Sequence, residues 1–99
     1  MLNSQIKQTA EQSNEVMDIL QEEAAEVIQA VSKIRRFGAD NHKYGHNQTN
    51  LEHLEEELGD MLAMIDILIS KQIINPASLE IAKLAKIEKL KKWSKIYAE

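Results

Sequence analysis

The chain has 99 residues, of which 43% are hydrophobic and 28% are charged, and its net charge is −4. This composition is typical of one folded globular domain and excludes a disordered chain, which would contain fewer apolar residues. The lack of cysteine excludes disulfides, zinc–thiolate sites and thiol catalysis, and only three glycines and one proline favour long helices over a sheet with many turns.

The apolar segments argue against secretion and membrane insertion. Residues 1–10 are polar and contain no signal-peptide core. Residues 61–69 are the most apolar stretch, but Asp66 interrupts them and they are far shorter than the ~20 residues that span a membrane. We therefore expect a cytoplasmic protein that does not bind membranes.

The first predicted helix extends from about residue 14 to residue 37. Ser13 or Asn14 is expected to cap its N-terminus, and Gly38 is expected to end it after the basic residues of the last turn. Whether residues 2–12 form a separate helix or continue this one stays open on the sequence alone.

Two further helices follow a polar loop at residues 38–49. Thr49 and Glu52 have the spacing of a capping box, which predicts a second helix from Thr49 or Asn50 to about residue 73. Asn75-Pro76 has the pattern of an N-cap followed by proline at the first helical position. A last helix is therefore expected from about residue 77 to residue 97, and residues 83–95 carry six lysines against one acid.

Apolar residues form one face of the first helix and cover more than half the circumference of the second. The face of the first helix comprises Val16, Ile19, Leu20, Val27, Ala30, Ile34 and Phe37. The two adjacent faces of the second helix comprise Met61, Met64, Ile67 and Leu68, and Leu58, Leu62, Ile65 and Ile69. A helix that is apolar on two sides needs to be covered on both. We therefore predict an all-α antiparallel helical bundle, a single domain over residues 1–99, completed by oligomerisation as a homodimer or homotetramer.

Four acids interrupt these apolar faces: Glu23 and Glu26 on the first helix, and Glu57 and Asp60 on the second. A buried carboxylate shifts its pKa or needs a counter-charge, and four that converge would repel one another without cations between them. Carboxylate oxygens suit Mg²⁺ or Mn²⁺, and no histidine stands where the Glu-x-x-His motif of di-iron bundles requires it. The competing interpretation is that both pairs lie on solvated faces, where this spacing is common.

The order of these acids resembles a known family. The sequence EEAAE at residues 22–26, followed by ELGD at residues 57–60, is similar to the EExxE…ExxD signature of the MazG-like all-α nucleotide pyrophosphohydrolases, and the similarity extends over about residues 15–97. It implies an oligomeric helical bundle that hydrolyses an NTP or dNTP to the monophosphate and pyrophosphate. Water, activated by the metal, would attack the phosphorus joined to the nucleoside.

The resemblance also assigns roles to individual residues. It implies that the metal ligands are Glu23, Glu26, Glu57 and Asp60. Glu22 matches the first glutamate of the motif and is expected to act as a base or to orient a ligand, so Glu22 and Glu23 are the catalytic candidates.

Several cations are candidates for binding the triphosphate. Lys86 resembles a family lysine near the start of a basic stretch, and Lys89 follows it on the same helix. Arg36, with Arg35 and Lys43, flanks the loop near one end of the predicted site, where an arginine fork would match phosphate oxygens. Alternatively, the lysines form a solvated face and the arginines only complement the helix dipole.

Other functions compete with the enzyme hypothesis. His42, His46 and His53 have no cysteine partner, so we interpret them as surface histidines and not as zinc ligands. A non-catalytic helical module could bind a partner protein through its acids, which would then be exposed, whereas an enzyme needs them to converge. Nucleic-acid binding through the lysine-rich helix is opposed by the net charge of −4.

Overall fold

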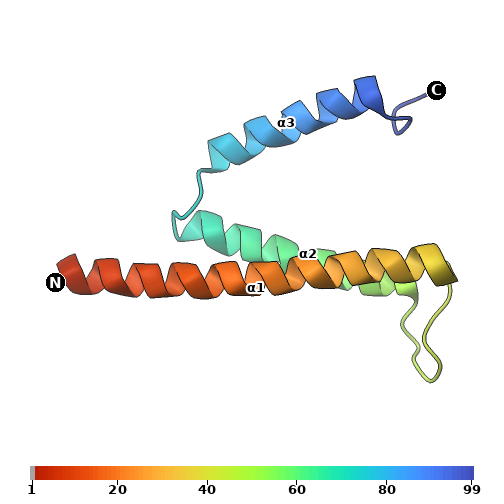
Figure 1. Cartoon of the computed structure of the whole chain (residues 1–99), viewed down its shortest axis with the longest axis horizontal. Coiled ribbons are helices and arrows are strands. Elements are labelled where there is room, and N and C mark those ends of the chain that lie inside the picture. The colour runs from red at the N-terminus through yellow and green to blue at the C-terminus, as the bar shows by residue number, and fades with distance from the viewer. Residues whose placement is uncertain (1) are drawn as a thin grey trace. The chain divides into compact units, whose positions relative to one another are not determined.

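Three helices follow one another in the part of the chain that the computed structural model describes, which is residues 2–99, with side chains from residue 10 onward. They are α1 (Leu2–Phe37), α2 (Asn50–Ser70) and α3 (Pro76–Trp93) (Figure 1). The described residues contain no β-strand, only an isolated antiparallel bridge between His42 and Thr49. The predicted all-α fold class is confirmed.

The chain divides into two compact units, Met1–Leu68 and Ile69–Glu99. The first unit contains α1, the loop after it and nearly all of α2, and the second contains α3. No helix in residues 2–99 offers an apolar stretch of the length that a bilayer crossing requires.

Helix α1 is one continuous helix from Leu2, so the predicted N-cap at Ser13 or Asn14 is wrong. Residues 2–12 contain neither glycine nor proline, and Ser13 and Asn14 lower helix stability only slightly when they lie inside a helix. Nothing in the sequence therefore interrupts α1 at these positions. Its end is as predicted: Gly38 has φ of 91°, and its N–H donates to the Ile34 carbonyl at 2.8 Å.

The start of α2 is fixed by the predicted capping box, which the structure confirms. The Glu52 N–H donates to Thr49 Oγ1 at 3.1 Å, and the Thr49 N–H donates to Glu52 Oε1 at 3.0 Å. The hydrogen bonds that the backbone N–H and, second, the side chain of Thr49 make with the Glu52 carboxylate lower the pKa of Glu52. Helix α2 ends at Ser70 and not near residue 73, because Gln72 takes a positive φ of 61° and donates its N–H to the Ile69 carbonyl at 2.9 Å.

Helix α3 begins as predicted and ends earlier than predicted. Asn75 Oδ1 accepts hydrogen bonds from the N–H groups of Ala77 at 2.8 Å and Ser78 at 3.4 Å, and proline takes the first helical position. The helix stops at Trp93, before residue 97, because both the N–H and the hydroxyl of Ser94 donate to the Leu90 carbonyl, at 3.0 and 2.7 Å. No residue of α3 is buried.

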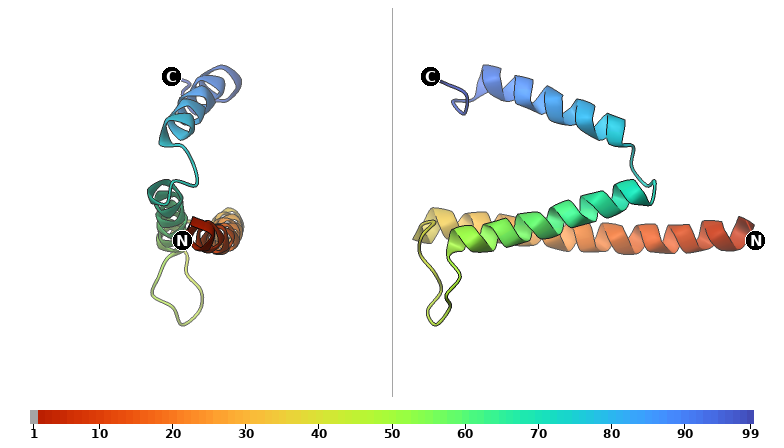
Figure 2. Two further views of the ribbon diagram at one scale, coloured as in Figure 1. Left: turned by 90° about the vertical axis from the view of Figure 1, so that its left-hand side faces the viewer. Right: turned by 180° about the vertical axis from the view of Figure 1, so that it is seen from behind.

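In the first unit, α1 and α2 form an antiparallel hairpin and lie side by side in both views of Figure 2. The buried apolar residues of this hairpin are Val16, Ala30, Met64 and Leu68. The second apolar face of α2 is open in the single chain, since Leu58 is 40% and Leu62 59% exposed. Phe37, predicted on the apolar face of the first helix, is 55% exposed because it lies in the last turn of α1, beyond that buried core.

Candidate metal centre

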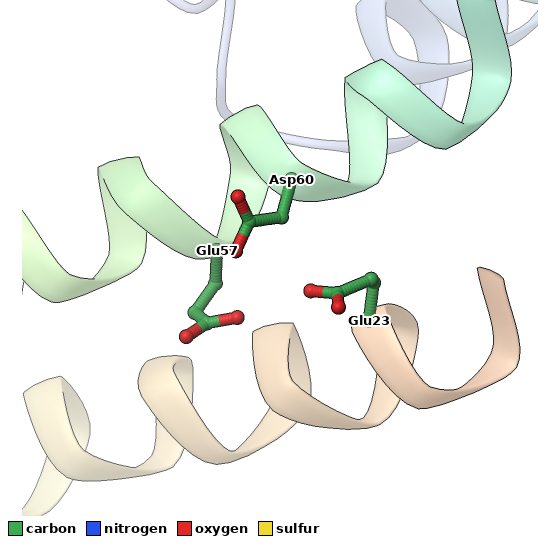
Figure 3. Close-up of side chains that lie close together, drawn as sticks. All are labelled: Glu23, Glu57 and Asp60. Carbon is green, nitrogen blue, oxygen red and sulfur yellow. The ribbon is translucent and has the colours of Figure 1, made fainter. Parts of the chain in front are cut away.

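Three carboxylates from the two helices of the hairpin converge on one point. Glu23 comes from α1, and Glu57 and Asp60 come from α2, and one oxygen of each lies within 4.8 Å of the other two (Figure 3). The spacing of three residues places Glu57 and Asp60 on the same side of α2, and the antiparallel packing brings Glu23 opposite them. In Figure 3 the carboxylates of Glu23 and Glu57 point into the space between the two helices, and the carboxylate of Asp60 lies close to them at α2.

The surroundings of these groups are unequal. Glu57 is buried, with 8% of its surface exposed, whereas Glu23 is half-buried and Asp60 is exposed. Desolvation raises the pKa of Glu23 above its ordinary value of 4.5. Nearby negative charges raise this pKa further, those of Asp60, Glu57 and Glu26 in order of effect, and so does a hydrogen bond with Glu57. The cluster thus gathers negative charge that a cation would relieve.

The donor set fits a hard divalent cation. Three carboxylate oxygens on two helices are the ligand type that Mg²⁺ and Mn²⁺ take in proteins, and the cluster contains neither sulfur nor histidine that would favour a softer metal. The hydrogen bond between the carboxyl groups of Glu23 and Glu57 requires a proton on one of them, and a bound cation would relieve their repulsion in its place.

The two other acids of the motif lie outside this group of three. Glu26 is half-buried one turn after Glu23, and its charge contributes to the raised pKa of Glu23. Glu22 is exposed on α1. The structure therefore brings together three of the four residues predicted as metal ligands, and it places Glu26 next to them.

His53 is a neighbour of this cluster, although its sequence context indicated only a surface residue. Its Nε2 lies 3.2 Å from Oε1 of Glu57, and its side chain is 24% exposed. The two residues are four apart on α2, which is the spacing at which helical side chains meet. That spacing was the signal in the sequence that pointed to this contact.

The predicted substrate-binding cations are distributed over both units. Arg36 lies in the last turn of α1, with its guanidinium carbon 5.2 Å from the centre of the Phe37 ring. Lys86 and Lys89 lie on α3 in the second unit, and both are exposed. Neither lysine has an ion-pair partner among the described residues, unlike Lys83 and Lys91 on the same helix.

One comparison with known proteins shows the family of the chain. Neither the curated proteins nor the solved structures contain a match to the chain. A family model does match: that of the MazG nucleotide pyrophosphohydrolase domain, over residues 11–94, which include α2, α3 and all three converging carboxylates. With this match over most of its length, the chain belongs to the MazG nucleotide pyrophosphohydrolase domain family.

Proposed function

We propose that this protein is an Mg²⁺-dependent nucleoside triphosphate pyrophosphohydrolase that converts an NTP or dNTP to the monophosphate and pyrophosphate in the cytoplasm. The observation that carries the proposal is the convergence of Glu23, Glu57 and Asp60 in a chain of this family. A docking surface for a partner protein would need these acids exposed and apart, and the burial of Glu57 opposes that alternative.

Each acid of the motif has a role in this proposal. Glu23, Glu57 and Asp60 hold Mg²⁺ (with Mn²⁺ as the substitute), and Glu26 joins them from the next turn of α1. The ion, when bound, polarises phosphoryl oxygens and lowers the pKa of the attacking water. The water oxygen bonds to the α-phosphorus, the bond from that phosphorus to the bridging oxygen breaks, and pyrophosphate leaves. Glu22, exposed beside Glu23, accepts the proton of the water.

Cations outside the cluster bind the charged end of the substrate in this proposal. Lys86 and Lys89 are free of ion-pair partners in the described residues, so their ammonium groups are available to phosphate oxygens. Arg36 lies at the end of α1, away from the carboxylates, so its planar fork of donors would contact the substrate beyond its pyrophosphate group.

We also propose that the 99 residues act as one domain that works as a homodimer or homotetramer. The family match extends across both compact units, which supports a single functional domain. The first unit leaves large apolar side chains exposed, and a second subunit would cover them: Met17, Ile28, Val31, Leu51, Leu58 and Leu62.

The test is pyrophosphate release from a panel of NTPs and dNTPs in millimolar MgCl₂. We expect release that requires Mg²⁺, that disappears in Glu57→Gln and that persists in Glu55→Gln, the same change at an exposed glutamate of the same helix. Folded wild-type protein that releases no pyrophosphate from any nucleotide would overturn the proposal.

A further inference from the structure

The first unit contains a cavity of about 590 Å³ at the end of the helical hairpin where the chain turns from α1 to α2. Both helices and the loop at residues 38–49 line it. The lining residues that bear on its chemistry are Lys33, Phe37, His42, Lys43, His46 and His53. We refer to it as the loop cavity.

We propose that the loop cavity binds the nucleoside end of the substrate and selects bases that carry a carbonyl oxygen, and not an amino group, at C6 of a purine or C4 of a pyrimidine, namely guanine, uracil and thymine. This inference rests on the proposed function, because it places the α-phosphate of the same nucleotide at the converging carboxylates.

The position of the loop cavity relative to the carboxylates fits one nucleotide. His53 lines the cavity and also lies 3.2 Å from Glu57, so the cavity begins within one helical turn of the cluster. From there it follows α2 back to Asn50, which is about 10 Å from Glu57 at the 1.5 Å rise of a helix. In a nucleotide, the sugar and base extend a similar distance away from the α-phosphate. The compact pyrophosphate group would stay near the metal.

The wall of the loop cavity suits a base and sugar better than a polyphosphate. It is more apolar than polar, and its volume is that of a site for a small organic ligand. The Phe37 ring is 55% exposed, with the Arg36 guanidinium 5.2 Å from its centre, and such a ring can stack on a base.

The wall of the loop cavity offers two ammonium groups as hydrogen-bond donors. Within the described residues, the ammonium groups of Lys33 and Lys43 have no partner. Two acceptors of the wall are, in contrast, already engaged: Asn41 Oδ1 accepts from the His42 N–H at 2.9 Å, and Glu56 Oε2 accepts from Gln48 at 2.7 Å. A base that presents carbonyl oxygens pairs with free donors, and an amino group at the same place does not.

The loop is held in place before any ligand arrives. The Asn50 N–H donates to the Asn41 carbonyl at 2.7 Å, and the Leu51 N–H donates to the Ala39 carbonyl at 3.0 Å. The side-chain amide of the buried Asn50 donates to the Gly38 carbonyl at 3.0 Å. These bonds fix the base of the loop against α2, so little ordering entropy is lost when a ligand binds there.

The first experiment is an NMR titration of the full-length protein with UMP, GMP and AMP without metal. We expect shifts of the backbone amides at residues 41–48 and 53, larger for UMP and GMP than for AMP. Lys43→Ala and Phe37→Leu should weaken binding about fivefold to tenfold, as the loss of one good contact does. Tyr44→Ala is the matched control, because Tyr44 is fully exposed on the same loop and does not line the cavity.

The second experiment measures steady-state kinetics of the same variants. We expect KM to rise about tenfold with kcat nearly unchanged, since uniform binding is lost, and the base preference to flatten in Lys43→Ala. Wild-type turnover together with cavity variants that match Tyr44→Ala in KM and base preference would overturn the inference alone. No turnover by the wild type would overturn the proposed function, and the titration would then decide the loop cavity by itself. Lys43 lies in an exposed loop, so this variant stays informative if Phe37→Leu fails to fold.

Discussion

Helices α2 and α3 are both rich in charge, but they carry it in opposite ways. On α2, Glu57 is buried and meets Asp60 and a carboxylate of α1. On α3 no residue is buried, and two lysines form exposed pairs with glutamates three positions earlier, Lys83 with Glu80 at 3.3 Å and Lys91 with Glu88 at 3.1 Å. Such exposed pairs contribute only about 0.2–0.5 kcal/mol each. A charged side chain indicates a functional site when burial or nearby like charges raise the free energy of its charged form. Charge alone does not indicate one.

The same comparison separates the lysines of α3 from one another. Lys83 and Lys91 already have carboxylate partners, whereas Lys86 and Lys89 have none in the described residues. If α3 contributes to substrate binding, we therefore expect the effect at the unpaired lysines. This contrast can be tested by mutation, and the largest effect is expected at the carboxylates of α2.

Beside Glu57→Gln, replacing Asp60 should lower the activity the most. Asp60→Asn removes one of three converging carboxylates, and we expect the rate of pyrophosphate release to fall about 10²- to 10³-fold, the equivalent of about 3–4 kcal/mol of metal-dependent stabilisation. Asp66→Asn is the matched control, because Asp66 is exposed on the same helix and outside the cluster. Equal losses in the two variants would mean that the convergence has no special role.

Replacing Lys86 should have a smaller effect and should show whether α3 acts on the substrate. We expect Lys86→Ala to raise KM about tenfold, since one charge-assisted hydrogen bond to a phosphate is worth about 1.5–3 kcal/mol at most. Lys83→Ala, which breaks only an exposed ion pair, should leave KM within about twofold of the wild type. If both variants behave alike, the lysines of α3 form only a solvated face.

Removing the N-terminal caps of α2 and α3 compares how each helix contributes to the stability of the fold. Thr49→Ala and Asn75→Ala each remove a side-chain cap, at a cost of about 1 kcal/mol. Because α2 packs in the hairpin, we expect Thr49→Ala to lower the unfolding midpoint of the whole first unit. Helix α3 buries none of its own residues, so Asn75→Ala should instead increase amide hydrogen exchange in its first turn. Global destabilisation by Asn75→Ala would contradict this difference.

The smallest expected effect is a pH dependence of stability in metal-free protein. The pKa of Glu23 is raised above its ordinary value of 4.5 in the folded chain, so above that value the folded state binds more protons than the unfolded one. The contribution of Glu23 is fully favourable below pH 4.5 and is lost as the pH rises through the folded pKa.

The measurement is urea unfolding with EDTA between about pH 4 and pH 7, with Glu23→Gln beside the wild type. The wild type should lose stability relative to the variant as the pH rises, with a difference in slope of at most about one proton. A relative gain by the wild type would contradict the raised pKa. Mg²⁺ should oppose the loss, because it competes with the proton for the same oxygens.

Local signals in the sequence predicted the ends of helices wherever one side chain decides the geometry. Gly38, the Thr49–Glu52 pair and Asn75 act in the structure as their residue types require. The N-cap expected at Ser13 or Asn14 failed because a capping residue stops a helix only if the preceding segment prefers another conformation, and α1 continues through it. Periodicity also predicted that acids of two separate segments would approach, since a hairpin of two helices has few registers.

The loop cavity could not be predicted from the sequence. Its shape depends on the path of residues 38–49, and loops follow no periodic pattern that fixes their conformation. The hydrogen bonds that set this path join residues about ten positions apart, such as Asn41 with Asn50. The contact of His53 with Glu57 could, in contrast, be predicted from the sequence, because helical geometry alone brings residues four apart together.

The hydrogen bonds that close the base of the loop have a consequence for how this protein can change in evolution. The bonds from Asn50 and Leu51 back to residues 38–41 hold the start of α2 without help from the tip. Insertions or substitutions at residues 43–48 therefore leave the carboxylates where they are, and longer loops cost little additional closure entropy. Residues 43–48 could therefore be replaced as a block during evolution. The base preference would then change while the hydrolytic centre stays the same.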